Sequence, residues 1–408
     1  AESIDLVLTD PPYGLNFNDG DLTHRREVAL GKKANGGLAA VWERAVGKGE
    51  PVFVIAEAGV NHNGDRTRAL ALVEAAAKAG ADAVKFQTFR AEALTTAATP
   101  KADYQARNTG EAGNQLAMLK ALELSVEDHR VLMDACRARG VEFMSTPFES
   151  DSARLLIETL NVPRLKVASG EITNGPLLLQ LARSHKPIIL STGMSTLEEV
   201  KTALGVIAFG YVMPPDAEPS PRAFREALKS LSGKAALGDK VTVLHCTSEY
   251  PAPPETINLR AMTTLAKTFG LPVGLSDHSQ GISVAVAAVG LGASVIEKHF
   301  TLDKSLPGPD HKASLTPDEF TDMVAAIRVV ERALGEGDKK PVAAEEKTRA
   351  VARKSLVAVK PIAAGELFSA DNLGIKRPGG SFPPMALWTY LGKPSPRAYA
   401  VDDLVDPL

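Results

Sequence analysis

Eight short runs rich in β-branched residues alternate with longer stretches of helical spacing between residues 51 and 335. The runs cover residues 51–59, 82–88, 141–147, 164–171, 187–193, 241–248, 272–279 and 294–300. Strands that alternate with helices are typical of a parallel sheet, and eight strand and helix pairs are enough to close a barrel. The sequence therefore predicts an α/β fold, with a (β/α)8 TIM barrel over residues 51–335.

The chain has 408 residues, which is more than a barrel of about 250 residues requires. Glycine, lysine and proline interrupt the helical pattern after Leu334, so residues 336–350 are predicted to be a linker. Residues 351–408 read as short strands and turns, a small β-rich domain that needs support from a barrel, its own or a partner's. Residues 209–240 contain prolines and then a basic helical segment, which predicts a surface insertion of unknown role.

Composition excludes several classes of protein. The net charge is −3, so the chain lacks the basic excess that nucleic-acid binding requires. No apolar run approaches the roughly 20 residues of a membrane span, and the beginning of the sequence does not resemble a secretion signal. The two cysteines, Cys136 and Cys246, are too few and too far apart for a disulfide framework. We therefore expect a cytoplasmic protein with no nucleic-acid or membrane partner.

Residues 1–50 do not fit the barrel pattern. Residues 4–14, IDLVLTDPPYG, resemble the strand and catalytic loop of amino-directed DNA methyltransferases. A methyltransferase also needs a glycine-rich loop for S-adenosylmethionine with a core behind it, and about 50 residues cannot supply both. Residues 1–50 are therefore predicted to be an extension that carries a remnant of this motif, poorly ordered over residues 15–50, without a working methyltransferase site.

Polar residues at the ends of the predicted strands suggest where the chemistry takes place, because the carboxyl ends of barrel strands meet at one face. His278 and His299 end the seventh and eighth strands, which are neighbours in a barrel. Two imidazoles without a thiolate favour a loosely held Mn²⁺ or Mg²⁺ over a structural zinc ion. Such a cation keeps open positions that can polarise an aldehyde oxygen.

Lys85 and Lys166 are flanked by apolar residues on their strands, where a buried ammonium group needs an anionic partner. Strand-end hydroxyls accompany them: Ser145, Thr146, Ser169, Ser191, Ser248 and Ser276. Such a ring of cations and hydroxyls suits a phosphate and a carboxylate, and phosphoenolpyruvate carries both. A Schiff base between either lysine and a carbonyl substrate is an alternative that the spacing leaves open.

Three acidic residues are candidate catalytic acids and bases. Glu57 ends the first strand, Glu171 follows the fourth, and Asp310 lies in the loop after the eighth. All three can reach the barrel mouth. The prolines around Asp310 leave a second interpretation open, in which this residue only shapes a turn.

Taken with their loops, the strand ends resemble the bacterial sialic acid synthases from about residue 51 to residue 400. The matching strings are AEAGVNHNGD (56–65), VKFQTF (84–89), STPF (145–148), KVASGEITN (166–174), ILSTGM (189–194), LHCTSEYPAP (244–253), GLSDHS (274–279), EKHFTLDKSLPGPDHKASL (297–315) and ARKSLVA (352–358). The first and fourth also resemble legionaminic acid synthases. In this family a (β/α)8 barrel precedes an antifreeze-like β-clip domain, which is expected here over residues 351–408.

The resemblance implies a domain-swapped homodimer that condenses phosphoenolpyruvate with N-acetylmannosamine and depends on a divalent metal. The alternative substrate is the 2,4-diacetamido-6-deoxy analogue used by legionaminate synthases. By motif match, Lys85, Thr146, Lys166, Ser169, Ser191, Ser276 and, with less support because some members have asparagine there, Ser248 would hold phosphoenolpyruvate. Glu57, Gln87, Asn108, Glu171, Tyr250 and Asp310 would contact the amino sugar, and Arg377 would bind its N-acetyl group from the other subunit. His278 and His299 would bind the metal.

Three other functions remain open on the sequence alone. A Schiff-base sugar aldolase would form a borohydride-trappable imine on Lys166 and release no phosphate. A sugar-binding protein that has lost catalysis would do neither. A DNA methyltransferase would bind S-adenosylmethionine through the segment around Asp10 and Tyr13.

Overall fold

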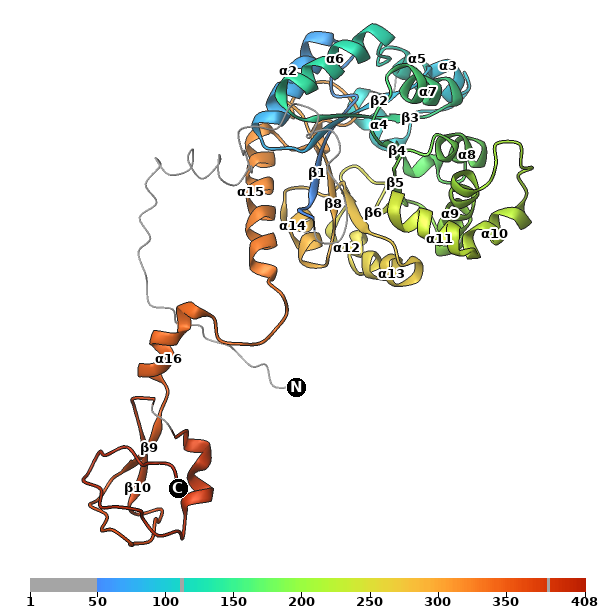
Figure 1. Ribbon diagram of the computed structural model, residues 1–408. Helices are drawn as coiled ribbons and strands as arrows, with labels where there is room; N and C mark the ends of the chain where they lie inside the picture. Colours follow the sequence, from blue (N-terminus) through green and yellow to red (C-terminus); the bar gives the residue numbers. More distant parts are fainter. Residues whose placement is uncertain (1–49, 111–113, 380–381) are drawn as a thin grey trace. The chain divides into compact units, whose positions relative to one another are not determined.

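The computed structural model describes residues 50–110, 114–379 and 382–408 (Figure 1). The predicted methyltransferase-like remnant and the expected poor order of residues 15–50 therefore lie outside the described residues, apart from residue 50. The chain divides into two compact units, of which the first ends at Leu334 and the second begins at Gly335. Each unit is described by itself.

Eight parallel strands form the sheet of the first unit. They are β1 (Phe53–Gly59), β2 (Ala83–Thr88), β3 (Glu142–Pro147), β4 (Leu165–Val167), β5 (Ile188–Ser191), β6 (Val241–Cys246), β7 (Val273–Asp277) and β8 (Val295–His299). Their order is β3-β2-β1-β8-β7-β6-β5-β4, so β3 and β4 are the two ends of a nearly closed barrel. Each predicted run contains one of these strands, and the predicted (β/α)8 barrel is confirmed.

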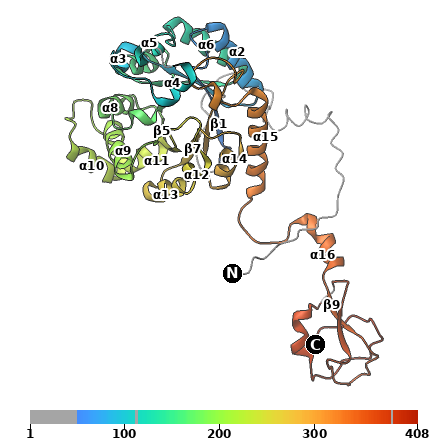
Figure 2. The same ribbon diagram turned by 180° about the vertical axis from the view of Figure 1, so that it is seen from behind.

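Helices follow the strands and cover the barrel (Figures 1 and 2). The main ones are α2 (Arg66–Lys78), α6 (Val126–Arg139), α7 (Ser150–Arg154), which continues into the π-helix η2 (Leu155–Thr159), α8 (Gly175–Arg183), α9 (Leu197–Val212), α13 (Arg260–Phe269), α14 (Ser283–Gly290) and α15 (Pro317–Leu334). N-cap residues determine where several of these helices begin. The side chains of Asp65, Ser125 and Thr196 accept hydrogen bonds from backbone N–H groups in the first turns of α2, α6 and α9.

Short helices lie within the longer connections. α3 (Ala91–Leu94), α4 (Asp103–Thr109) and α5 (Gln115–Lys120) follow β2, and α12 (Pro254–Ile257) follows β6. In the predicted insertion, α10 (Pro221–Lys229) and α11 (Leu231–Lys240) both pack on α9. The ring of Phe224 meets that of Phe209 edge-on at 5.3 Å, so the insertion is anchored on the outer helical layer.

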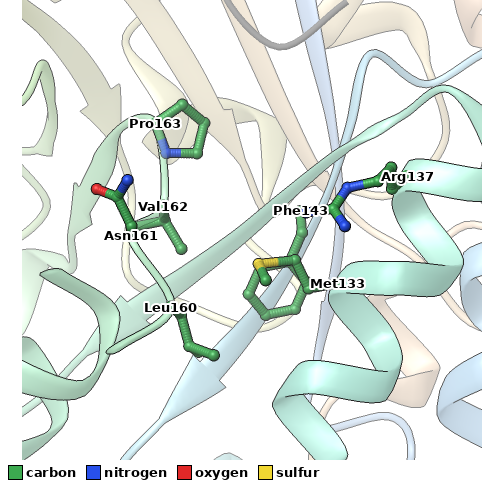
Figure 3. Close-up of a pocket in the computed structure, with 7 residues that line it drawn as sticks. All are labelled: Met133, Arg137, Phe143, Leu160, Asn161, Val162 and Pro163. Carbon is green, nitrogen blue, oxygen red and sulfur yellow. The ribbon is translucent and has the colours of Figure 1, made fainter. Parts of the chain in front are cut away.

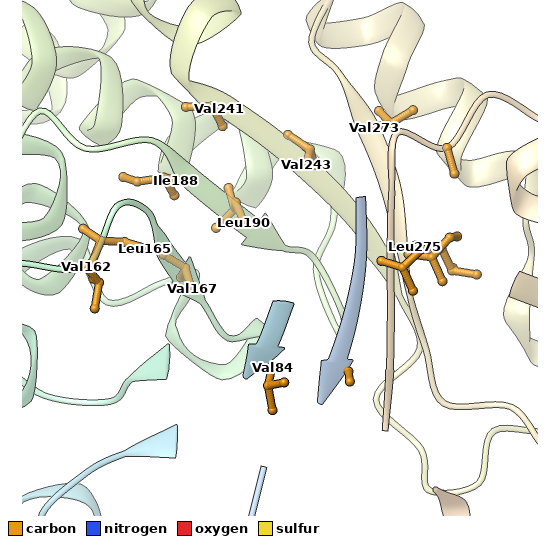
Figure 4. Packing of buried hydrophobic residues seen from close by; sticks show 14 of the residues in the cluster. Val84, Val162, Leu165, Val167, Ile188, Leu190, Val241, Val243, Val273 and Leu275 are labelled. Carbon is orange, nitrogen blue, oxygen red and sulfur yellow. The ribbon is translucent and has the colours of Figure 1, made fainter. Parts of the chain in front are cut away.

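Side-chain alternation divides the apolar core of the barrel into two layers. Residues pointing inward fill the barrel interior, namely Phe53, Ile55, Ala83, Met144, Ile189, Leu244 and Val295. Residues pointing outward pack under the helices, among them Val84, Leu190, Val243 and Leu275 (Figure 4). The interior is therefore closed by apolar side chains, and polar side chains remain at the carboxyl ends of the strands.

The second unit is small and β-rich. Its antiparallel strands β9 (Ser355–Ala358) and β10 (Leu373–Lys376) follow η5 (Ala343–Glu345) and α16 (Glu346–Ala352), and η6 (Pro384–Ala386) and α17 (Leu387–Tyr390) come after them. Its core is formed by Leu356, Ala358, Ile362, Phe368, Leu373, Tyr390, Tyr399 and Val405. The predicted small β domain is therefore present. Because α16 occupies part of the expected linker, the boundaries at residues 336–350 stay a prediction.

A pocket of about 250 Å³ lies on the outside of the barrel, at the amino-terminal ends of the strands (Figure 3). It is lined by Met133, Arg137, Phe143, Leu160, Asn161, Val162 and Pro163. None of the predicted site residues is among them, so this pocket is not the candidate site. Within the described part of the chain, no helix is long and apolar enough to cross a membrane.

Candidate active site

Two lysines and two glutamates form a buried charge cluster at the carboxyl ends of four strands. Lys85 on β2 makes an ion pair with Glu57 on β1, its direct cross-strand neighbour. Glu297 on β8 lies between the lysines, with Oε2 3.7 Å from Lys85 Nζ and Oε1 3.4 Å from Lys166 Nζ. All four side chains are at most 5% exposed. The barrel thus brings together charges that are more than 200 residues apart in sequence.

Hydroxyl groups surround this cluster. Lys85 Nζ donates to Thr146 Oγ1 at 3.1 Å, and Lys166 Nζ donates to Ser191 Oγ at 2.8 Å. Ser276 Oγ donates to Glu297 Oε1 at 2.8 Å. Each of these three hydroxyl residues stands at or near the end of a strand, as the sequence predicts. The arrangement offers two ammonium groups and several hydroxyls to one anionic ligand.

Ser169 and Ser248 meet at the turn that follows β5. Gly193 N donates to Ser169 Oγ at 2.9 Å. A Cβ on Gly193 would lie 2.8 Å from Ser169 Oγ and 2.3 Å from Ser248 Oγ. Both hydroxyls therefore approach the backbone so closely that only glycine fits between them, and the two predicted phosphoenolpyruvate contacts lie side by side.

Burial and mutual attraction set the protonation of the cluster. Burial raises the pKa of Glu57 to about 7, and the attraction of Lys85 offsets only part of this effect. Burial also disfavours ionised Glu297, but the charges of Lys166 and Lys85 outweigh it and lower the pKa of Glu297 to about 2. Burial lowers the pKa of Lys166. A less ionised Glu57 leaves more of the positive charge of Lys85 to a bound anion.

His278 and His299 lie next to each other, with ring centroids 5.2 Å apart. His278 Nδ1 is 2.7 Å from the carbonyl oxygen of Thr247, which fixes this nitrogen as a donor and leaves Nε2 as an acceptor. His299 Nδ1 is buried without a hydrogen-bond partner among the described residues. The described chain contains no cluster of three or more His, Cys, Asp or Glu side chains able to hold an ion. Two imidazoles would leave the other positions around a bound cation to water or substrate.

Tyrosines line the site beside the histidines. The Tyr250 ring centroid is 4.1 Å from that of His278 and 5.4 Å from that of His299. Tyr104 on α4 stacks on Tyr250 at 4.9 Å. Gln87, on β2, approaches Glu57, since a Cβ on Gly59 would lie 3.5 Å from Gln87 Nε2 and 3.1 Å from Glu57 Oε1. An aromatic wall and an amide thus flank the charged cluster, a lining typical of small-molecule sites.

The loop after β8 brings Asp310 to the histidines. Asp310 Oδ2 is 3.9 Å from His299 Nδ1, and burial raises the pKa of Asp310 to about 6. Asn108 donates to the carbonyl oxygen of Pro309 at 2.6 Å, so its side chain braces this loop. Asn61 donates to Phe300 O at 2.8 Å and to Ser314 Oγ at 2.9 Å and ties the loop to the start of the barrel.

Glu171 and Arg377 are the remaining two predicted residues. Glu171 is half-buried in the 3-10 turn η3 (Ser169–Glu171) and accepts a hydrogen bond from Asn174 Nδ2 at 2.7 Å. Arg377 is exposed in the second unit. The barrel gathers the other predicted phosphoenolpyruvate, sugar and metal residues at one mouth, while the roles given to all of them stay predictions. Ser145 is an exception, because its Oγ lies 2.6 Å from Thr88 Oγ1 on the outer face of the barrel.

Sequence reasoning overlooked three residues of this mouth. Glu297 is absent from the predicted site, although its spacing of two residues from His299 puts both on the same face of β8. Tyr104 gave no signal because the loop after β2 has no regular pattern. Cys246 was read only as a free cysteine, yet its Sγ lies 3.7 Å from His278 Nδ1.

The fold and the mouth define a (β/α)8 barrel enzyme with a buried anion site next to a pair of imidazoles. The chain matches the model of the NeuB family over residues 72–339 and that of the SAF domain over residues 353–399. It is 47% identical over 340 residues to the N,N'-diacetyllegionaminic acid synthase of Legionella pneumophila, covering 83% of this chain and 89% of the relative.

Two further similarities agree with this match. The N,N'-diacetyllegionaminic acid synthase of Campylobacter jejuni is 44% identical over 353 residues, which cover 86% of this chain and 98% of the relative. The crystal structure of the N-acetylneuraminic acid synthetase of Leptospira borgpetersenii aligns with a TM-score of 0.60 and 31% identity, over 74% of this chain and 92% of that one.

The chain belongs to the NeuB family. It is a condensing enzyme of the transferase type that uses phosphoenolpyruvate. The resemblance to sialic acid synthases and the antifreeze-like second domain are confirmed.

Proposed function

We propose that the chain condenses phosphoenolpyruvate with a 2,4-diacetamido-6-deoxy mannose to give N,N'-diacetyllegionaminic acid and phosphate. This proposal is supported by the two relatives named N,N'-diacetyllegionaminic acid synthase, to which the chain is 47% and 44% identical. N-acetylmannosamine, the substrate favoured on the sequence alone, has less support, because the sialic acid synthetase of known structure is only 31% identical. The two candidate substrates differ in the sugar and share the same reaction class.

Phosphoenolpyruvate would bind in the cluster of Lys85 and Lys166. The ammonium groups and the hydroxyls of Thr146, Ser191 and Ser276 match a ligand that carries a phosphate and a carboxylate. Ser169 and Ser248 would add two hydroxyls beside Gly193. Glu57 is neutral or half-neutral near pH 7, so the bound anion meets less repulsion there.

His278 and His299 would hold a divalent cation, Mn²⁺ or Mg²⁺. The orphaned Nδ1 of His299 and the free acceptor Nε2 of His278 support this assignment. When bound, such a cation supplies Lewis acidity for the aldehyde oxygen of the sugar. Asp310, Gln87 and Tyr250 surround the same place and would orient the open-chain sugar, with Asn108 bracing the loop of Asp310.

Each bond that breaks is matched by one that forms. C3 of phosphoenolpyruvate forms a bond with C1 of the aldehyde, whose oxygen takes up a proton. Water adds to C2 and gives up a proton, and the C2–O bond to phosphate then breaks. This final loss of phosphate turns the new C2 hydroxyl into a carbonyl, while its proton leaves with the phosphate. Asp310, with a pKa near 6, is suited to give the first proton, and Glu171 to take the second. Lys85 and Lys166 would balance the departing phosphate.

We further propose that the protein works as a domain-swapped homodimer in which Arg377 of one subunit reaches the barrel of the other. The support is the family membership, the match of residues 353–399 to the SAF domain and the exposure of Arg377. A guanidinium group can bind the carbonyl oxygen of an N-acetyl group through two donors.

Phosphate release distinguishes the candidate functions. Metal-supplemented protein should release phosphate from phosphoenolpyruvate fastest with the diacetamido-6-deoxy sugar, and at least about tenfold more slowly with N-acetylmannosamine, since one lost set of polar contacts costs about 1.4 kcal/mol. Faster turnover of N-acetylmannosamine would contradict the proposed substrate.

An aldolase is the second candidate, because burial lowers the pKa of Lys166. It would instead give an imine on Lys166, trapped by borohydride, without phosphate release.

A further inference from the structure

A second buried ion pair lies on the two strands that carry the histidines. Asp277 ends β7 and Lys298 precedes His299 on β8, and the two residues are paired directly across the strands. Lys298 Nζ is 2.7 Å from Asp277 Oδ2, and both side chains are fully buried. Neither residue belongs to the charge cluster of Lys85, Lys166, Glu57 and Glu297.

Alternation along the strands separates this pair from the substrate site. Ser276 and Glu297 face the barrel interior, so their neighbours Asp277 and Lys298 face the outside. The pair therefore contacts no substrate. Burying an ion pair costs free energy unless further hydrogen bonds satisfy both groups. The hydrogen-bond partners of this pair therefore indicate which part of the chain the pair positions.

Those partners are backbone groups of Ser279, the residue that follows His278. Lys298 Nζ donates to Ser279 O at 2.6 Å, and Ser279 N donates to Asp277 Oδ1 at 2.9 Å. Ala252 N, from the loop after β6, donates to the carbonyl oxygen of His278 itself at 2.9 Å. The ring itself is fixed through the contact of Nδ1 with Thr247 O. The backbone on the carboxyl side of His278 and one ring nitrogen are thus held in place.

His299 follows Lys298 directly, so the pair joins the two strands at the positions next to both imidazoles. The affinity for a cation bound by only two protein nitrogens depends strongly on the distance and orientation of the two rings, because no third protein ligand contributes to binding. The strand pairing sets the distance between the strands, and the ion pair fixes the direction in which the chain leaves β7.

We propose that Asp277 and Lys298 are positioning residues that hold His278 and His299 at the geometry of a shared metal ion. This inference rests on the metal site of the proposed function. It assigns to a pair outside the mouth the task that hydrogen-bonded outer partners perform in metal sites.

The test measures Mn²⁺ binding to chelator-stripped, full-length protein by isothermal titration calorimetry. Lys298→Met keeps the length of the side chain and removes its charge, and it should weaken Mn²⁺ binding by about ten- to a hundredfold. Asp277→Asn keeps an acceptor for Ser279 N and is the milder variant, which carries the test if Lys298→Met does not fold. Phosphoenolpyruvate binding to the stripped variants should stay within about twofold of the wild type, because Lys85 and Lys166 are untouched.

Glu142 and Arg164 provide a matched control. Arg164 Nε is 2.6 Å from Glu142 Oε1, and this ion pair between the start of β3 and the residue before β4 is also buried but lies at the opposite end of the strands. Arg164→Met should lower the thermal midpoint to a similar extent and leave Mn²⁺ affinity within about twofold.

The outcomes separate the inference from the proposed function. Equal losses of Mn²⁺ affinity in Lys298→Met and Arg164→Met, or no loss in Lys298→Met and Asp277→Asn, would show that the Asp277–Lys298 pair only stabilises the fold. Wild-type protein that binds no Mn²⁺, or binds it unchanged after His278→Ala, would overturn the metal site itself and the inference with it. Selective loss in the Asp277 and Lys298 variants supports both.

Discussion

At the scale of single residues, His62 is held neutral by its surroundings. Its side chain is fully buried, Nδ1 accepts a hydrogen bond from Gly64 N at 3.0 Å, and Nε2 has no partner among the described residues. Burial, together with nearby His129, lowers the pKa of His62 from 6.5 to about 4. The unfolded chain therefore takes up a proton more readily than the folded chain between these pH values.

This difference predicts acid sensitivity of the β1 loop. The stability that neutral His62 contributes is complete above pH 6.5 and is lost as the pH falls towards 4. By pH 5 the loss amounts to about 2 kcal/mol, at about 1.4 kcal/mol per pH unit. His62→Asn, which keeps an acceptor for Gly64 N, should remove most of this loss, measured as the difference between urea unfolding free energies at pH 7 and pH 5. His185→Asn, at an exposed histidine, should behave like the wild type, and a pH loss undiminished in His62→Asn would contradict the prediction.

Residue types at strand ends predicted much of the mouth from the sequence. Lys85 and Lys166 were expected to lie close together because parallel strands end at one face of a barrel. The partner between them, Glu297, was not predicted, since which acid meets which lysine depends on strand register and on side-chain direction. Tyr104 was missed because a loop without periodicity gives no indication of where its side chains point.

At the scale of elements, the turn after β5 has no room for a side chain at Gly193. Gly193 lies where the hydroxyls of Ser169 and Ser248 converge, and the next residue, Met194, adopts a left-handed φ of 62°. The turn therefore packs its backbone against two groups that are expected to hold phosphoenolpyruvate.

Gly193→Ala should consequently weaken phosphoenolpyruvate binding. The new Cβ would lie 2.3 Å from Ser248 Oγ and displace both hydroxyls. Loss of about one hydrogen bond to a charged ligand, about 1.5 kcal/mol, corresponds to a roughly tenfold higher KM for phosphoenolpyruvate. The KM for the sugar should change less than about twofold. Gly170→Ala is the matched control, because in the described part of the chain no atom beyond its two sequence neighbours lies within 4 Å of its added Cβ. Equal KM values for Gly193→Ala and the wild type would refute this role of the turn.

Periodicity was sufficient to predict the strands and their order of appearance, because each run of β-branched residues is buried on both faces. It was insufficient for α3, α4 and α5, which are too short for a helical pattern to be distinguished from a loop. The contact of Asn108, at the end of α4, with Pro309 O could therefore not be predicted.

At the scale of the whole molecule, the chain combines a barrel with a small second unit whose only predicted site residue is Arg377. Sequence reasoning could predict both units, because each has its own apolar core. Which barrel a small domain serves depends on contacts between copies, and no pattern within one sequence encodes the answer directly.

Mixed dimers provide a decisive measurement of the proposed domain swap. Arg377→Ala leaves the barrel intact, and His278→Ala leaves the small domain intact, so each variant alone should be nearly inactive. If Arg377 acts on the partner's barrel, refolding the two variants together should restore about a quarter of the wild-type phosphate release per chain, because about half of the dimers are mixed and each has one complete site. Mixing either variant with the double variant Arg377→Ala/His278→Ala is the control and should restore nothing. If Arg377 serves the barrel of its own chain, every mixed dimer lacks a complete site, and mixing should leave the activity at the level of the separate variants.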